Sequence, residues 1–242
     1  MDVSSVAPPV AAVRGTATAP GGERAAAGLG GVAGPGFMDV FAHAGHVAFR
    51  RDLERLAAAA AAGRARAPLV RAGWENLKEQ LRLHNELQES VLLPRVERAV
   101  AGHRAELGVV AELRAEHPRI EALVTAVDAA LEDDEQGPGE VVAAVRRLRE
   151  ALEVHLRHEE AGALPLARRV LEAADWAAFA AGTVSLWAAA GAGCGEGTVP
   201  WMVDGIAPVE RSRFLTALPR EVRELSRLRW EPRYRRRRLW SV

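Results

Sequence analysis

Apolar residues recur at steps of three and four through four long segments, and this spacing constrains the fold of the 242-residue chain more than any other feature. Such steps place apolar side chains on one face of an α-helix, whereas no part of the chain shows the strict alternation of a half-buried strand. Long amphipathic helices with short links pack as an up-down four-helix bundle, so we predict an all-α fold. The segments cover about 38–62, 69–100, 104–133 and 140–173.

The two ends of the chain differ from these segments. Residues 1–36 are rich in Ala, Gly and Pro and have no period, which is typical of a disordered leader. We expect residues 37–175 to form the bundle. Residues 176–242 are more aromatic and less regular, and we expect a C-terminal helical extension there. Within it, apolar spacing predicts short helices near 208–217 and 219–229.

Composition excludes several classes of protein. The single cysteine, Cys194, lies in a predicted Gly-rich linker at 191–197 and cannot form an internal disulfide, so a disulfide-stapled secreted domain is excluded. The chain has no run of about 18 uncharged apolar residues to span a bilayer, and its N-terminus lacks the basic and apolar regions of a secretory signal. We therefore expect a cytoplasmic protein without a membrane partner.

The net charge of zero hides an uneven distribution. Residues 219–242 contain nine arginines and three glutamates, so the rest of the chain carries the balancing negative charge. Such a tail can contact nucleic-acid phosphates through its arginines, with Tyr234 and Trp240 stacking on bases. It can also pack on acidic residues of the same chain, such as Asp128. We favour packing within the chain and expect no nucleic-acid partner.

Six of the seven histidines lie within the four segments, and their positions repeat. A shift of 71 residues carries His46 onto His117 and His84 onto His155. The same shift pairs Leu81 with Leu152, Gln88 with Glu159, Glu89 with Glu160, Leu93 with Leu164 and Pro94 with Pro165. Agreement at seven positions in one register indicates a duplicated pair of helices.

The repeated residue types are those that bind metal ions. A histidine and a carboxylate four residues apart project from one face of a helix. Each half supplies one histidine from its first helix, and a histidine plus a carboxylate position from its second. In a bundle these six positions face one axis, and such a set suits a two-metal site. The candidate ligands are His46, His84, His117, His155 and Glu159.

Gln88 departs from this pattern, because the repeat matches it to Glu159. A neutral amide offers one oxygen and no charge, whereas a carboxylate can bridge two cations. Glu89 is an alternative ligand, although it lies about 100° around the helix from position 88. Glu121, four residues after His117, is another. Two metals, one metal and no metal are therefore all open outcomes.

Other residues near the candidate ligands have less specific interpretations. His43 and His158 lie three residues from candidate ligands, so they are expected either beside the site or on the surface. Pro94 and Pro165 each lie six residues after a ligand-type position and predict a helix kink there. His103 is expected to be exposed in a turn between helices.

Four runs of the sequence resemble the hemerythrin-like (HHE) cation-binding family, whose pattern is His and then His-x-x-x-Glu, twice over. The resemblance covers about residues 38–172, and the tail from about 199 onward looks like the extension of actinobacterial members. It implies a non-haem di-iron centre that binds oxygen, or that reacts with oxygen, peroxide or nitric oxide. The runs are 46–53, 74–94, 115–120 and 155–165.

Two functions follow from these observations. The first is an iron protein that binds or senses oxygen or a related small oxidant, in a pocket kept apolar by Leu81, Leu113 and Leu152. Turnover of peroxide or nitric oxide stays open, but the sequence shows no further general acid or base that would favour an enzyme over a binding protein. The second is a metal-free helical interaction module with a basic tail, in which Gln88 marks a degenerate site. The sequence indicates no particular protein partner.

Overall fold

The computed structural model describes residues 34–133, 137–189 and 196–241. Every regular element in these ranges is helical, which confirms the predicted all-α class. No helix within the described ranges is both long and apolar enough to cross a membrane. Most of the predicted leader at 1–36, and Cys194 with most of its Gly-rich linker, lie outside the described residues.

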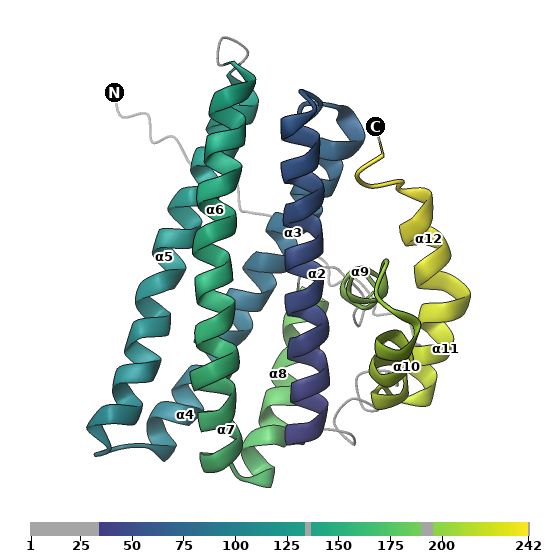
Figure 1. Ribbon diagram of the computed structural model, residues 1–242. Helices are drawn as coiled ribbons and strands as arrows, with labels where there is room; N and C mark the ends of the chain where they lie inside the picture. Colours follow the sequence, from purple (N-terminus) through teal and green to yellow (C-terminus); the bar gives the residue numbers. More distant parts are fainter. Residues whose placement is uncertain (1–33, 134–136, 190–195, 242) are drawn as a thin grey trace, which may run out of the picture.

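Four long helical arms build the bundle, within three residues of the predicted segments (Figure 1). The first arm is α2 (Pro35–Ala61). The second runs from α3 (Pro68–Leu87) through the π-helical turn η1 (Gln88–Leu92) into α4 (Leu93–Ala99). The third arm is α5 (Arg104–Glu132). The fourth runs from α6 (Pro138–His158) through η2 (Glu159–Ala163) into α7 (Leu164–Val170).

The arms pack around a common apolar core. Helix α6 packs against both α5 and α2, and α2 also packs against α3, whereas α3 and α5 make few backbone contacts with each other. The core is built from the apolar faces that the spacing predicted, because burial of these side chains is the main source of stability. Its largest fully buried members include Trp74, Phe49, Leu56, Leu77, Leu113 and Ile120.

Each of the two π-helical turns begins at a residue of the repeat. Turn η1 begins at Gln88 and η2 at Glu159, and the N–H of the residue before each proline donates to the carbonyl of that first residue. The next residue is Pro94 or Pro165, which has no N–H to offer to the carbonyl four residues earlier. The two prolines therefore mark local π turns beside the ligand positions.

The C-terminal extension contains more helix than we predicted. Helix α10 (Pro208–Ala217) confirms the first predicted helix, and α11 (Arg220–Leu225) runs through η4 (Ser226–Trp230) into α12 (Glu231–Arg236), beyond the second. Helices α8 (Ala173–Ala189) and α9 (Thr198–Val203) were not predicted. Helix α8 is apolar around almost its whole circumference, so it lacks the polar face that reveals a helical period.

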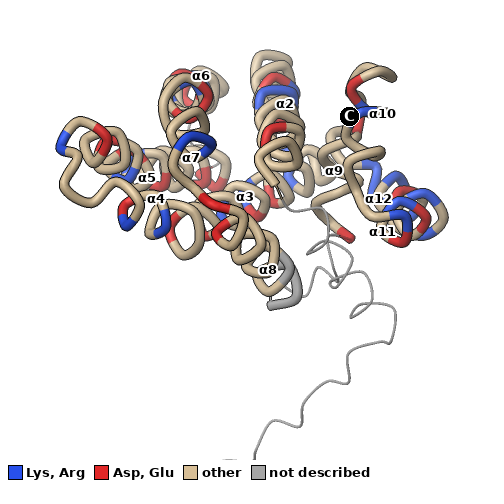
Figure 2. The backbone as a smooth tube through the Cα atoms, turned by 90° about the horizontal axis from the view of Figure 1, so that it is seen from below, with Lys and Arg blue, Asp and Glu red and all other residues tan. Residues whose placement is uncertain are grey.

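A buried ionic group attaches the extension to the bundle. Asp52 of α2 is 0% exposed and accepts a hydrogen bond from the Trp201 indole Nε1 at 2.8 Å. Arg51 donates to the same carboxylate at 2.8 Å, and also to the backbone carbonyls of Trp201 and Asp204. Helix α9 is thereby fixed on α2, and α9 to α12 lie on the side of α2 away from α5 and α6 (Figure 2).

The arginine-rich tail contacts the bundle at α3. The Trp240 backbone N–H donates to the Leu69 carbonyl at 2.8 Å, and Arg237 donates to the Asn76 side-chain oxygen at 2.8 Å. Asp128, which we named as an acidic partner of the tail, instead pairs with Lys78 at 2.8 Å. The tail thus packs within the chain, and the absence of a nucleic-acid partner stays a prediction.

Gly73 of α3 allows Trp240 to lie against the helix. A Cβ atom at position 73 would lie 2.4 Å from a Trp240 ring carbon. We expect Gly73→Ala to lower the free energy of unfolding by about 1–3 kcal/mol, because the ring must move. Gly108→Ala, in α5 with open space around it, should instead raise that free energy by about 0.5–1 kcal/mol. Urea unfolding measures both, and an equal change in the two variants would contradict the packing of Trp240.

Candidate metal centre

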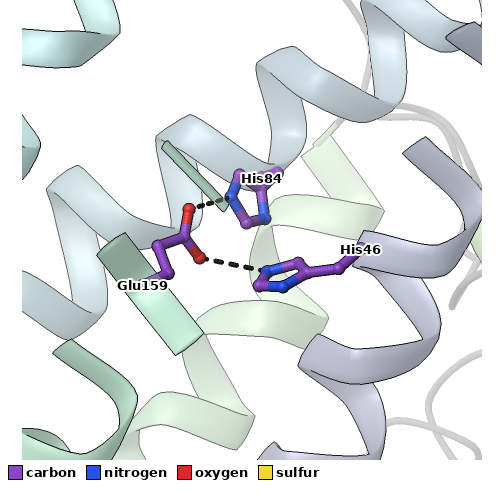
Figure 3. A group of neighbouring side chains, drawn as sticks. All are labelled: His46, His84 and Glu159. Carbon is purple, nitrogen blue, oxygen red and sulfur yellow. Dashed lines mark hydrogen bonds and ion pairs between the residues drawn. The ribbon is translucent and has the colours of Figure 1, made fainter. Parts of the chain in front are cut away.

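Three side chains from three helical arms meet at the centre of the bundle. His46 comes from α2, His84 from α3, and Glu159 is the first residue of η2. Their possible ligand atoms all lie within 4.8 Å of one another. The Glu159 oxygens lie 3.1 Å from His46 Nε2 and 3.0 Å from His84 Nε2 (Figure 3). A carboxylate that is 2% exposed therefore faces two imidazole nitrogens.

His155, His117 and Gln88 extend this group towards α5. His155 Nε2 lies 2.7 Å from Glu159 Oε1, and the His155 and His117 ring centroids are 5.0 Å apart. The Gln88 side chain lies between the two halves, 2.9 Å from His84 Nε2 and 3.1 Å from His117 Nε2. The structure thus brings together all five candidate ligands and the amide at the sixth position.

Carboxylates contact the outer nitrogens of His46 and His117, the two histidines that the first helix of each half supplies. His46 Nδ1 lies 2.8 Å from Glu160, and His117 Nδ1 lies 2.6 Å from Glu89. The 71-residue shift relates these two contacts, and each one crosses from one half to the other. Because an ionised carboxylate can only accept, each Nδ1 carries a proton, and each Nε2 points inward, towards Glu159 in the case of His46 and towards the Gln88 oxygen in the case of His117. Both histidines are thereby oriented as metal ligands.

Arginines hold these carboxylates in turn. Arg50 of α2 lies 2.9 Å from Glu160, and Arg114 of α5 lies 3.0 Å from Glu89. The Arg50 and His46 contacts together lower the pKa of the Glu160 carboxyl, although burial opposes this change. Both carboxylates are therefore oriented from two sides, by a histidine and by an arginine.

His155 has the same kind of support, whereas His84 lacks it. His155 Nδ1 lies 2.8 Å from Glu116, which also contacts His158. The 71-residue shift carries Glu116 onto Gly45, so the first half has no equivalent carboxylate. Among the described residues, no carboxylate is hydrogen-bonded to His84 Nδ1. This is the main difference between the two halves.

The chemistry of the group fits a cation. Burial alone would raise the pKa of Glu159, but His84, His155 and His46 hold it well below its usual range. His155 Nε2 lies close to Glu159 in a geometry that is not a hydrogen bond, so this buried nitrogen has no hydrogen-bond partner among the described residues. Imidazole nitrogens that converge on one buried carboxylate can bind a metal ion in place of the protons that they donate to it.

Comparison with known families agrees with this geometry. Residues 41–167 match the family model of the hemerythrin HHE cation binding domain. The chain belongs to this family. No curated protein and no solved structure matches the chain. The HHE match ends within α7, so helices α8 to α12 lie beyond it, and their likeness to actinobacterial members stays a prediction.

The structure places two of the alternative ligands outside the HHE centre. Glu89 contacts the outer nitrogen of His117 and not its Nε2, so it orients that ligand. Glu121 is exposed and lines a groove between α3 and α5. Neither of them replaces the carboxylate that is missing at Gln88. The one carboxylate that touches several of the inward nitrogens is Glu159.

The remaining histidines lie at the surface of the HHE bundle. The His43 side chain is 61% exposed and lies 3.7 Å from Glu210. The His158 side chain is 52% exposed and contacts Glu116, so it borders the site from outside. His103 is exposed, as predicted, directly before α5.

Sequence reasoning missed several supports of the HHE centre. Glu160 and Glu89 were visible as a matched pair in the repeat, but the repeat gave them no role. Nothing in the repeat marked Glu116, because its partner position is a glycine. Leu81, Leu113 and Leu152, which we expected to keep the oxygen pocket apolar, are buried; none of them lines the cavity beside His84, and Leu81 lines the groove at His117.

Proposed function

We propose that this HHE protein binds iron in the bundle and uses it to bind or sense oxygen, peroxide or nitric oxide. The observation that carries the proposal is the convergence of three imidazoles, those of His46, His84 and His155, on the buried Glu159, with His117 stacked beside His155. Residues that would hold the iron are His46, His84, His117, His155 and Glu159. Bound iron would supply redox chemistry and open coordination positions. Imidazole and carboxylate donors, with no thiolate among them, suit non-haem iron.

The protein's own residues hold these ligands ready for the metal. Glu160, Glu89 and Glu116 accept from Nδ1 of three histidines, so the Nε2 of each histidine points inward and would bind the metal in its deprotonated form. Burial of Glu159 keeps water away from the centre and strengthens its attraction to a cation. We propose ligand binding rather than turnover, with no catalytic residue assigned.

We further propose that the two metal positions differ in affinity. The position near His46 and His84 has the Glu159 carboxylate between its ligands. The position near His117 has the neutral Gln88 amide instead, which offsets no charge. The wild type should therefore hold one metal tightly and a second one more weakly.

Gln88→Glu tests this difference directly. Restoring the carboxylate should raise the affinity of the second metal by at least about tenfold, because it would add a negative charge beside His117. Metal titration followed by isothermal calorimetry would measure both affinities in both proteins. If the wild type already binds two metals with equal affinity and the substitution changes nothing, the two positions do not differ.

A visible spectrum tests the iron site itself. Iron-loaded protein exposed to air should show the charge-transfer absorption of a di-ferric centre, and His117→Ala, which removes a ligand of the second iron, should lose most of it. His103→Ala is the matched control, because His103 is exposed and outside the centre. A colourless wild type without bound metal would favour the metal-free interaction module.

The cytoplasmic location stays a prediction.

A further inference from the structure

An apolar cavity of about 50 Å³ lies beside His84, between α2, α3 and the extension. One end of it is formed by His84, Gln88 and Glu159, so it opens onto one side of the candidate metal centre. A site needs only about 10–15 Å³ of such space to hold one water molecule, so this cavity suits a small molecule of a few atoms. Its apolar walls include Phe41, Ala42, Leu83, Leu92, Phe179 and Met202.

The difference between the two halves creates this cavity. In the second half, Glu116 holds the outer nitrogen of His155 and contacts His158. The 71-residue shift places Gly45 and Leu87 at these positions of the first half, and both of them line the cavity. The first half thus has a glycine where the second half has the Glu116 carboxylate. It has a leucine side chain where the second half has the His158 imidazole. The cavity beside His84 therefore lacks the ionic pair that fills the equivalent place beside His155.

The extension closes the cavity from outside the family domain. Phe179 of α8, and Trp201 and Met202 of α9, are 1–4% exposed and line it. All three lie beyond residue 167, where the HHE match ends. The Met202 methyl carbon would lie 3.5 Å from a Cβ atom at Gly45, so this side chain faces the glycine and forms part of the cavity wall. The Asp52–Trp201 hydrogen bond fixes this wall on α2.

We propose that this cavity is a chamber for one small neutral molecule, and that the extension sets its size limit through Met202. An ion is disfavoured there, because Glu159 is the one charged carboxylate in the lining and is already surrounded by histidines. The α3–α5 groove on the other side, at His117, is lined by charged residues such as Glu75, Lys78 and Arg82. What the molecule does after it enters rests on the proposed function; the chamber itself does not.

Dissolved oxygen tests the chamber without iron. Met38 and Met202 both line the cavity, are 7% and 4% exposed, and can be labelled with ¹³C at the methyl group. Oxygen is paramagnetic, so it should broaden both methyl signals of metal-free protein, and nitrogen purging should reverse the effect. Ala42→Leu fills the chamber and should remove the broadening. Ala58→Leu, on the exposed face of the same helix, should leave it unchanged.

Xenon tests the size limit. It is larger than oxygen, so it should shift the Met38 signal more in Met202→Ala, where the cavity is enlarged, than in wild type. An equal shift in both proteins would show that Met202 sets no limit. Circular dichroism confirms the fold of each variant. The series is then repeated with zinc-loaded protein, because zinc fills the centre and is redox-inert and diamagnetic.

The outcomes separate this inference from the proposed function. Absence of oxygen broadening in wild type, or unchanged broadening in Ala42→Leu, would overturn the chamber even if the protein binds iron. Broadening that follows the expected pattern in a protein that binds no iron would support the chamber and contradict the proposed function.

Discussion

Glu159→Gln is expected to abolish tight metal binding, the largest functional effect of any single substitution in this chain. Glu159 is 2% exposed and its carboxylate contacts the inward nitrogens of His46, His84 and His155. Glutamine keeps the shape but removes the one negative charge among these ligands, so a bound cation would lose its charge partner in a buried site. Metal analysis after equilibrium dialysis against iron measures the loss.

Glu160→Gln is the matched control for that loss. It removes the neighbouring carboxylate, which orients His46 from the outer side and contacts no inward nitrogen. Loss of such a supporting partner typically weakens metal affinity by about 10–100-fold without removing the site. Equal metal content in Glu159→Gln and wild type would show that Glu159 is not the central ligand.

Asp52→Asn is expected to cause the largest loss of stability, about 3 kcal/mol in the free energy of unfolding. The Asp52 carboxylate is 0% exposed and accepts from Trp201, Arg51 and Arg55. An amide cannot accept at both of its ends, so it leaves a buried donor unpaired and Arg51 without its charge partner, whereas Arg55 keeps Asp204 at 2.8 Å. The attachment of α9 to α2 is therefore weakened together with the wall of the chamber.

Glu54→Gln is the control for Asp52→Asn. Glu54 lies on the same helix and pairs with Arg149, but its side chain is 66% exposed. Exposed pairs of this kind contribute at most about 1 kcal/mol, so its loss should be small. Guanidinium unfolding, followed by tryptophan fluorescence, measures both variants. Similar losses in the two would mean that the Asp52 group does not hold the extension.

The bundle could be predicted from the sequence because its helices have one apolar and one polar face. The bounds of α2 and α5 follow from where this helical spacing of apolar residues begins and ends, and from the glycine and proline residues between segments. The 71-residue repeat also brought His46, His84, His117 and His155 into one prediction, since a bundle leaves one axis for them to share. Local patterns therefore determined both the arms and the candidate ligands.

The extension and the cavity could not be predicted in this way. Helix α8 is apolar on almost all sides, and α9 has six residues, too few to show a period. The contact of Trp201 with Asp52 joins residues 149 positions apart, and no local pattern encodes such a pair. The role of Gly45 became visible only when the structure placed Glu116 at the equivalent position of the other half.

Anomalous diffraction from iron-loaded crystals, recorded at the iron absorption edge, tests the central claim most directly. We predict an anomalous peak among His46 Nε2, His84 Nε2 and the Glu159 oxygens, with a second and weaker peak beside His117 and His155. A protein that gives no peak in this part of the bundle, or whose iron lies elsewhere, would contradict the assignment of the centre.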